Sequence, residues 1–82
     1  MKITPLSKRL TAYLEKHNIQ KSFEKQQFLF EQNPCHASLR TEILKPKHLK
    51  IYSFRITQKY RAIFVYCGKS TIEIIDINNH YQ

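Results

Sequence analysis

The chain has 82 residues, 41% of them hydrophobic, with five tyrosines and five phenylalanines, so we expect a packed core rather than disorder. We expect one domain, residues 1–82, in the cytoplasm, because no apolar run approaches the ~18 residues of a membrane span and the start of the chain is unlike a signal peptide. The net charge of +8 favours a polyanionic partner, which leaves nucleic acid, an acidic protein and an anionic membrane open.

Two amphipathic helices are predicted at the start of the chain. Apolar residues spaced by three and four predict a helix over residues 5–17, with Thr4 as a cap and proline in the first turn. After a break at Asn18, the same spacing predicts a second helix over residues 19–31. The two helices would form a hairpin, and three phenylalanines are expected to pack it against a sheet: Phe23, Phe28 and Phe30.

The rest of the chain predicts a long loop and then strands. Residues 35–50 lack a useful periodicity and contain Pro46, which indicates a loop with a short extended piece at residues 38–44. Three β-branched and aromatic segments predict an antiparallel meander: residues 51–57, 60–67 and 71–77. The last strand has apolar residues on both parities and is expected to be the most covered. The predicted fold class is α+β, an N-terminal helical hairpin packed on a small antiparallel sheet of three to four strands.

Positive charge is concentrated in the loop and the first hairpin, where Glu42 is the only acidic residue between Arg40 and Arg61. If the turn after Ile56 has three residues, Arg55 and Arg61 face each other on one side of the hairpin, and the aromatic side chains line the other. A two-residue turn would instead place Arg61 beside Ile56. Arginine on a rigid strand is a preorganised fork for phosphate oxygens, with a structural salt bridge as the alternative.

These residue types suit the cleavage of RNA through its own 2′-hydroxyl. That reaction needs a base for the hydroxyl proton, an acid for the leaving 5′-oxygen and a cation for the crowded phosphorane. Glutamate or histidine can act as base, histidine as acid and arginine as cation, and no metal or other cofactor is required. The meander can bring Glu42, Arg61, His80 and Tyr81 toward one end of the molecule, where the tyrosine ring can stack on a base.

The order of elements resembles the RelE/ParE superfamily of bacterial toxins from toxin-antitoxin pairs, over roughly residues 6–82. Three strings carry the resemblance: Asn33-Pro34 before SLRTEIL, the RIT-x-x-[YH]-R string from Arg55 to Arg61, and the closing His80-Tyr81. The details look closest to YoeB-like ribosome-dependent mRNA endonucleases. The YoeB-like string has histidine where this chain has Tyr60. The chain also departs from the family in that residues 1–4 offer only a stub where the family has a full first strand, and in that it runs one residue past Tyr81.

The resemblance implies a role for each candidate site residue. Glu42 corresponds to the base, Arg61 to the phosphate clamp, His80 to the acid and Tyr81 to the orienting ring. Many relatives have histidine where Glu42 stands, so the proton-transfer role of Glu42 is the less direct assignment. The other basic residues of this region are expected to bind RNA: Arg40, Lys45, Lys47, Lys50, Arg55 and Lys59.

The resemblance also implies partners. These are the ribosome with its mRNA and a cognate antitoxin, which would be acidic, partly disordered and folded on binding. A homodimer is a further option, and no membrane partner is expected. Two other functions stay open on the same fold: a ParE-like inhibitor of DNA gyrase without a nuclease site, and an inactive relative that binds RNA or an antitoxin.

Overall fold

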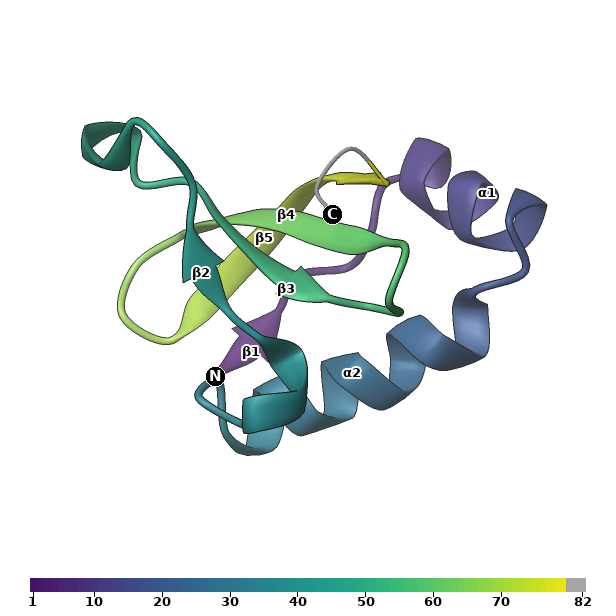
Figure 1. The fold of residues 1–82 in the computed structure, drawn as a ribbon, viewed down its shortest axis with the longest axis horizontal. Coiled ribbons are helices and arrows are strands. Elements are labelled where there is room, and N and C mark those ends of the chain that lie inside the picture. Colours follow the sequence, from purple (N-terminus) through teal and green to yellow (C-terminus); the bar gives the residue numbers. More distant parts are fainter. Residues whose placement is uncertain (80–82) are drawn as a thin grey trace.

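The computed structural model describes residues 1–79, in which two helices pack against one five-stranded sheet. The strand order across the sheet is β1-β5-β4-β3-β2 (Figure 1). β1 runs parallel to β5, and all other neighbours are antiparallel. The strands are β1 (Lys2–Ile3), β2 (Glu42–Ile43), β3 (Tyr52–Arg55), β4 (Arg61–Tyr66) and β5 (Thr71–Asn78).

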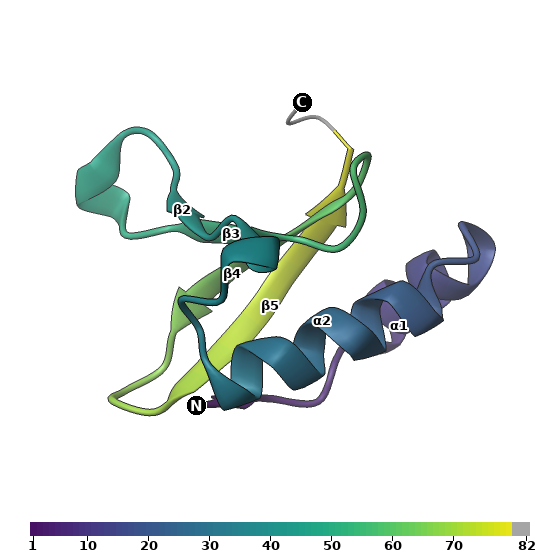
Figure 2. The same ribbon diagram turned by 60° about the horizontal axis from the view of Figure 1, so that its bottom comes forward.

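The two helices, α1 (Lys8–Lys16) and α2 (Gln20–Gln32), form the predicted hairpin on one side of the sheet (Figure 2). The predicted start of α1 was wrong. The hydroxyl of Ser7 accepts a hydrogen bond from the Leu10 amide at 3.2 Å and caps the helix, so the chain before Ser7 stays outside it. The predicted break at Asn18 is confirmed, because this residue has a φ of 55° in the left-handed region. Neither helix is long and apolar enough to cross a bilayer.

The core lies between the helices and the facing side of the sheet, which we call the helix-covered face. Phe30 from α2 contacts both Phe54 and Phe64, with each pair of ring centroids 5.3 Å apart. Phe28 does not join this core, since it is 62% exposed. Gln26 takes the inward position on α2, where its side-chain amide donates to the carbonyls of Arg55 at 2.7 Å and Ser38 at 3.2 Å. The amide therefore connects α2 to β3 and to the segment before β2.

The sheet has five strands rather than the three to four predicted, and it is mixed rather than antiparallel. The additional strands, β1 and β2, have two residues each, so neither is long enough to show a period-two pattern in the sequence. β1 is held by its backbone: the amides of Lys2 and Thr4 donate to the carbonyls of Ser70 and Ile72 at 2.8 and 2.9 Å. The stub at the N-terminus is thus a short parallel edge strand.

β4, not β5, is the most covered strand, because it lies in the middle of the sheet. The register between these strands shifts at Ile63/Phe64, where Ile63 pairs with Asp76 and Phe64 pairs with Ile74. Ile75 is the extra residue of a β-bulge. The bulge explains why apolar residues of β5 occupy both parities: the pattern reflects a register change rather than burial on two faces.

The β3–β4 hairpin has the register expected for a three-residue turn. Arg55 pairs with Arg61, and the amide of Ile56 donates to the carbonyl of Tyr60 at 2.9 Å across residues 57–59. Because strand side chains alternate, Ser53 and Ile63 share the face of the two arginines, which we call the second face. The hairpin is apolar toward the helices and basic on its second face, as predicted.

The predicted long loop contains short structured pieces. They are the 3₁₀ turns η1 (Ala37–Leu39) and η2 (Lys47–Leu49), with β2 between them. Residues 44–51, which we call the arm, include η2 and stand out from the sheet on the side away from the helices (Figure 2). The end of β5 at Asn78 lies on that side too, so the arm and the last residues of β5 flank the second face.

Candidate active site

Arg61 is the centre of the candidate site, at the start of β4 on the second face. Its side chain is only 10% exposed, and three acceptors hold it: Nε donates to the Ser53 hydroxyl at 2.9 Å, while Nη2 donates to the carbonyls of Arg40 at 2.6 Å and Ser53 at 3.4 Å. None of its contacts within residues 1–79 uses Nη1, so these two N–H groups are available to the oxygens of a phosphate. The guanidinium is therefore fixed in place and still able to bind an anion.

Glu42 lies beside this guanidinium. It pairs with Ser53 in the β2–β3 ladder, which places it on the second face, and its Oε1 is 3.9 Å from Arg61 Nη2. The Glu42 side chain is 58% exposed, so it is open to a substrate while it stays next to the cation. The structure thus brings together the predicted carboxylate and the predicted phosphate clamp.

Two further arginines surround Arg61. Arg55 is directly opposite it in the ladder, and Arg40 supplies its backbone carbonyl from a left-handed conformation with a φ of 45°. Burial lowers the pKa of the Arg61 guanidinium, Glu42 acts in the opposite sense, and Arg55 and Arg40 lower it further. An arginine keeps its charge at neutral pH under such conditions. The fold holds three arginines close together although their charges repel, and this arrangement favours an anionic ligand.

The predicted RNA-binding lysines lie further out. Lys45, Lys47 and Lys50 are exposed on the arm. Lys59 is exposed on the β3–β4 turn, where its Nζ lies 5.8 Å from the centre of the Tyr60 ring. None of these four side chains contacts the Arg61 guanidinium within residues 1–79. They form an exposed basic rim rather than a part of the centre, and their compact ammonium groups on flexible stems suit contacts with phosphates along a chain.

His80 and Tyr81, the predicted acid and orienting ring, lie outside the described residues. Their assignment stays a prediction. β5 ends at Asn78, which pairs with Arg61 in the ladder, so the described chain leaves the sheet beside the candidate site.

Sequence reasoning missed Ser53, which is fully buried and provides two of the acceptors that hold Arg61. The alternation of β3 contained the signal, because Ser53 is two residues from Arg55 and therefore shares its face. It also missed a polar pair on β5, where the Asn78 amide donates to Asp76 Oδ2 at 2.9 Å. A polar residue two positions from a functional arginine on a strand therefore indicates a side chain that can hold the arginine in place.

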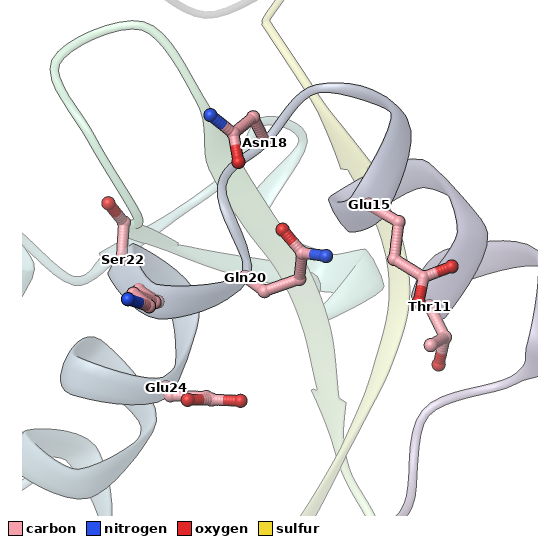
Figure 3. A pocket seen from close by; sticks show the side chains of 7 residues that line it. Thr11, Glu15, Asn18, Gln20, Ser22 and Glu24 are labelled. Carbon is pink, nitrogen blue, oxygen red and sulfur yellow. The ribbon is translucent and has the colours of Figure 1, made fainter.

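A separate polar hollow of about 770 Å³ lies in the helical hairpin, away from Arg61. Figure 3 shows side chains from the end of α1 and the start of α2 around it, among them Glu15, Gln20 and Glu24. Its lining brings no cation cluster or buried reactive group together. Among residues 1–79 no three histidine, cysteine, aspartate or glutamate side chains are placed to hold a metal ion.

The described chain thus has an α+β fold, with a helical hairpin over one sheet face and a buried arginine beside a glutamate on the other. Among solved structures, the chain is similar to the YoeB/ParE toxin from Agrobacterium tumefaciens, with a TM-score of 0.73 and 21% identity over 99% of this chain and 100% of that chain. It is also similar to a chain of the YoeB-YefM complex from Staphylococcus aureus, with a TM-score of 0.71 and 22% identity over 99% and 98% of the two chains.

A heterotetrameric YoeB-YefM toxin-antitoxin complex from the same organism contains a further similar chain, with a TM-score of 0.70 and 21% identity over 99% and 98%. No family model matches the sequence, and no curated protein matches it significantly. At this level of identity the likeness establishes the fold. The chain therefore has the fold of YoeB/ParE toxins, which confirms the predicted fold class and the structural side of the resemblance.

Proposed function

We propose that this chain is the toxin of a type II toxin-antitoxin pair and that it cuts mRNA on the ribosome. The observation that supports this most is the arrangement of Arg61, which is buried, fixed by three acceptors and 3.9 Å from an exposed carboxylate. A buried arginine that served stability alone would be expected to use all its N–H groups within the protein. A phosphate clamp needs N–H groups that remain free.

In the proposed reaction, Glu42 takes the proton of a ribose 2′-hydroxyl, and the 2′-oxygen attacks the adjacent phosphorus. Arg61 stabilises the charge on the pentavalent phosphorane. The P–O5′ bond then breaks, His80 gives a proton to the leaving 5′-oxygen, and the products are a 2′,3′-cyclic phosphate and a 5′-hydroxyl. Tyr81 orients the RNA. The scheme balances without a metal, and free RNA is a poor substrate because the ribosome presents the message.

The basic rim supports this proposal. Lys45, Lys47 and Lys50 project from the arm beside the second face, where they can attract the phosphates on either side of the scissile bond. Two of the similar chains come from complexes of YoeB with YefM. We infer that this chain likewise binds a cognate antitoxin, whose acidic character would complement the net charge of +8.

The test uses two variants on translating ribosomes, with the 5′ ends of the message mapped. Glu42→Gln keeps size and exposure but removes the base, so cleavage should fall by about 10²–10⁴. Arg61→Ala should abolish detectable cleavage. Lys25→Ala is the control, since Lys25 is an exposed basic residue on α2, away from the second face, and it should cut like the parent. Intact messages with the parent protein at full ribosome occupancy would refute the proposal.

A gyrase inhibitor is the second candidate, because one similar structure is described as a YoeB/ParE toxin. A supercoiling assay separates the two. Inhibition of gyrase by the parent and by Glu42→Gln alike, with no new 5′ ends on the message, would favour the ParE-like function.

A further inference from the structure

A second feature of the second face is the bulge in β5. Because Ile75 and Asp76 together oppose Ile63, the bulge turns two neighbouring side chains of β5 toward the second face. Bulges of this kind re-aim side chains and are common beside functional sites. Ile75 is 37% exposed, although the three other isoleucines of β5 are at most 4% exposed on the helix-covered face. An apolar side chain is thus displayed on the basic side of the protein.

The bulge forms one wall of a groove of about 260 Å³, whose other wall is the arm. Ile63 lies at its floor and is 5% exposed, while Leu49 of the arm is 54% exposed at its rim. The volume is just under the ~300 Å³ at which pockets for small molecules begin, so it suits a single flat ring system rather than a whole folded segment. The aliphatic walls suit the faces of such a ring.

The end of the groove is polar. Asp76 and Asn78 line it together, and Asn78 pairs with Arg61 in the β4–β5 ladder. The Asp76 carboxylate accepts from Asn78 at 2.9 Å and from Arg9 at 3.5 Å, one contact on each oxygen. Each carboxylate oxygen has two lone-pair sites, so Asp76 can accept at least one more hydrogen bond from a ligand. The groove therefore has an acceptor at one end and apolar sides.

We propose that this groove is a nucleobase subsite that binds one base of the RNA next to the phosphate held by Arg61; the inference rests on the proposed function. Charge complementarity selects this occupant. Lys45 lines the groove, two more lysines belong to the arm, and Arg61 is the ladder partner of the lining residue Asn78, so a chain with an apolar flat group and phosphates on both sides fits it. A purely apolar peptide would leave these cations unpaired.

The carboxylate sets a base preference. It accepts hydrogen bonds from exocyclic amino groups, which adenine, cytosine and guanine have, whereas uracil offers only its ring N3–H. Bases with an amino group should therefore bind about tenfold better than uracil, the order of one good base-edge contact. Asp76→Asn replaces an acceptor by an amide that can also donate, so the preference should shift toward uracil.

The test measures binding without cleavage. The full-length protein with ¹³C-labelled isoleucine methyls is titrated with the RNA tetramers A4, C4 and U4, each with 2′-methoxy groups that block the reaction. A4 and C4 should shift the Ile63 and Ile75 resonances, and U4 should need about ten times the concentration. In Asp76→Asn that ratio should fall to about one or invert. Arg9→Ala removes the other partner of Asp76 and keeps the groove, so it should retain the parent's preference.

Cut-site mapping gives an independent readout. For Asp76→Asn, the readout is the fraction of cuts with uracil next to the scissile phosphate, which should rise relative to the parent whatever the total rate of cutting. If the parent protein cuts mRNA but its isoleucine methyl resonances do not shift with any of the three tetramers, the subsite is overturned and the proposed function stands. Methyl shifts that follow protein concentration without RNA would assign the groove to a second copy, and they would overturn it as well. If the parent protein does not cut mRNA, the proposed function is refuted, and the tetramer titration alone then tests whether the groove binds a base.

Discussion

Ser53→Ala is the sharpest test of how the fold holds Arg61. The substitution removes the hydroxyl that accepts from Arg61 Nε at 2.9 Å and leaves the two backbone acceptors in place. A hydrogen bond to a charged group contributes about 1.5–3 kcal/mol, and the lower end applies here because the guanidinium keeps other partners. The free energy of unfolding should therefore fall by about 1.5 kcal/mol, which corresponds to a loss of about 6–12 °C in Tm for a domain of this size.

Thermal unfolding followed by circular dichroism measures this loss. Ser70→Ala is the matched control, because Ser70 is exposed on the turn between β4 and β5 and the same substitution there should change Tm by less than about 2 °C. Cleavage by Ser53→Ala at a temperature where it is folded should fall by about tenfold, since the freed guanidinium can tilt away from the phosphate. A Ser53→Ala protein as stable as the parent would refute the view that this hydroxyl supports Arg61.

Three further predictions concern the surroundings of the site. Gln26→Ala leaves the buried carbonyls of Arg55 and Ser38 without their side-chain donor, so urea unfolding should show a loss of about 2 kcal/mol, and an unchanged midpoint would contradict it. Arg55→Gln removes a like charge opposite Arg61, so Tm should rise by about 1–8 °C while the affinity for single-stranded RNA falls; a lower Tm would count against the repulsion. Burial, with Tyr52 and Cys35 adding to it, raises the pKa of the Tyr66 phenol above its ordinary 10.0, so its contribution to stability is complete below about pH 10 and is lost as the pH rises through the folded pKa. The Tm of Tyr66→Phe should therefore fall less than the Tm of the parent between pH 8 and about pH 11, and an equal fall in both proteins would contradict this.

Long elements with regular patterns were predictable from the sequence. Both helices, the break at Asn18 and the three longer strands follow from the spacing of apolar residues, and the structure confirms them with ends shifted by a few residues. The pairing of Arg55 with Arg61 also follows from alternation, once the turn is given three residues. The central clamp was therefore predictable because it sits on a hairpin with one apolar and one basic parity.

Other features depend on contacts that a single sequence does not contain. β1 and β2 have two residues each and exist because neighbouring backbones accept their hydrogen bonds. The inward position of Gln26 and the outward position of Phe28 reverse the usual preference, because two buried carbonyls need the amide. The β-bulge at Ile75 imitates a strand with two covered faces, so alternation alone leads to the wrong conclusion there.

The β3–β4 hairpin contributes side chains to the core on one face and to the candidate site on the other. Strand side chains alternate strictly, so packing Phe54 and Phe64 against α2 also fixes where Ser53 and Arg61 point on the other side. A slip of one residue would bury the arginines under the helices and expose the phenylalanines, which costs far more than the repulsion between the two guanidinium groups. The protein can therefore hold like charges opposite each other in the free state, because the stability of the aromatic core exceeds that cost. An incoming phosphate then relieves a repulsion already present and needs little rearrangement of the sheet.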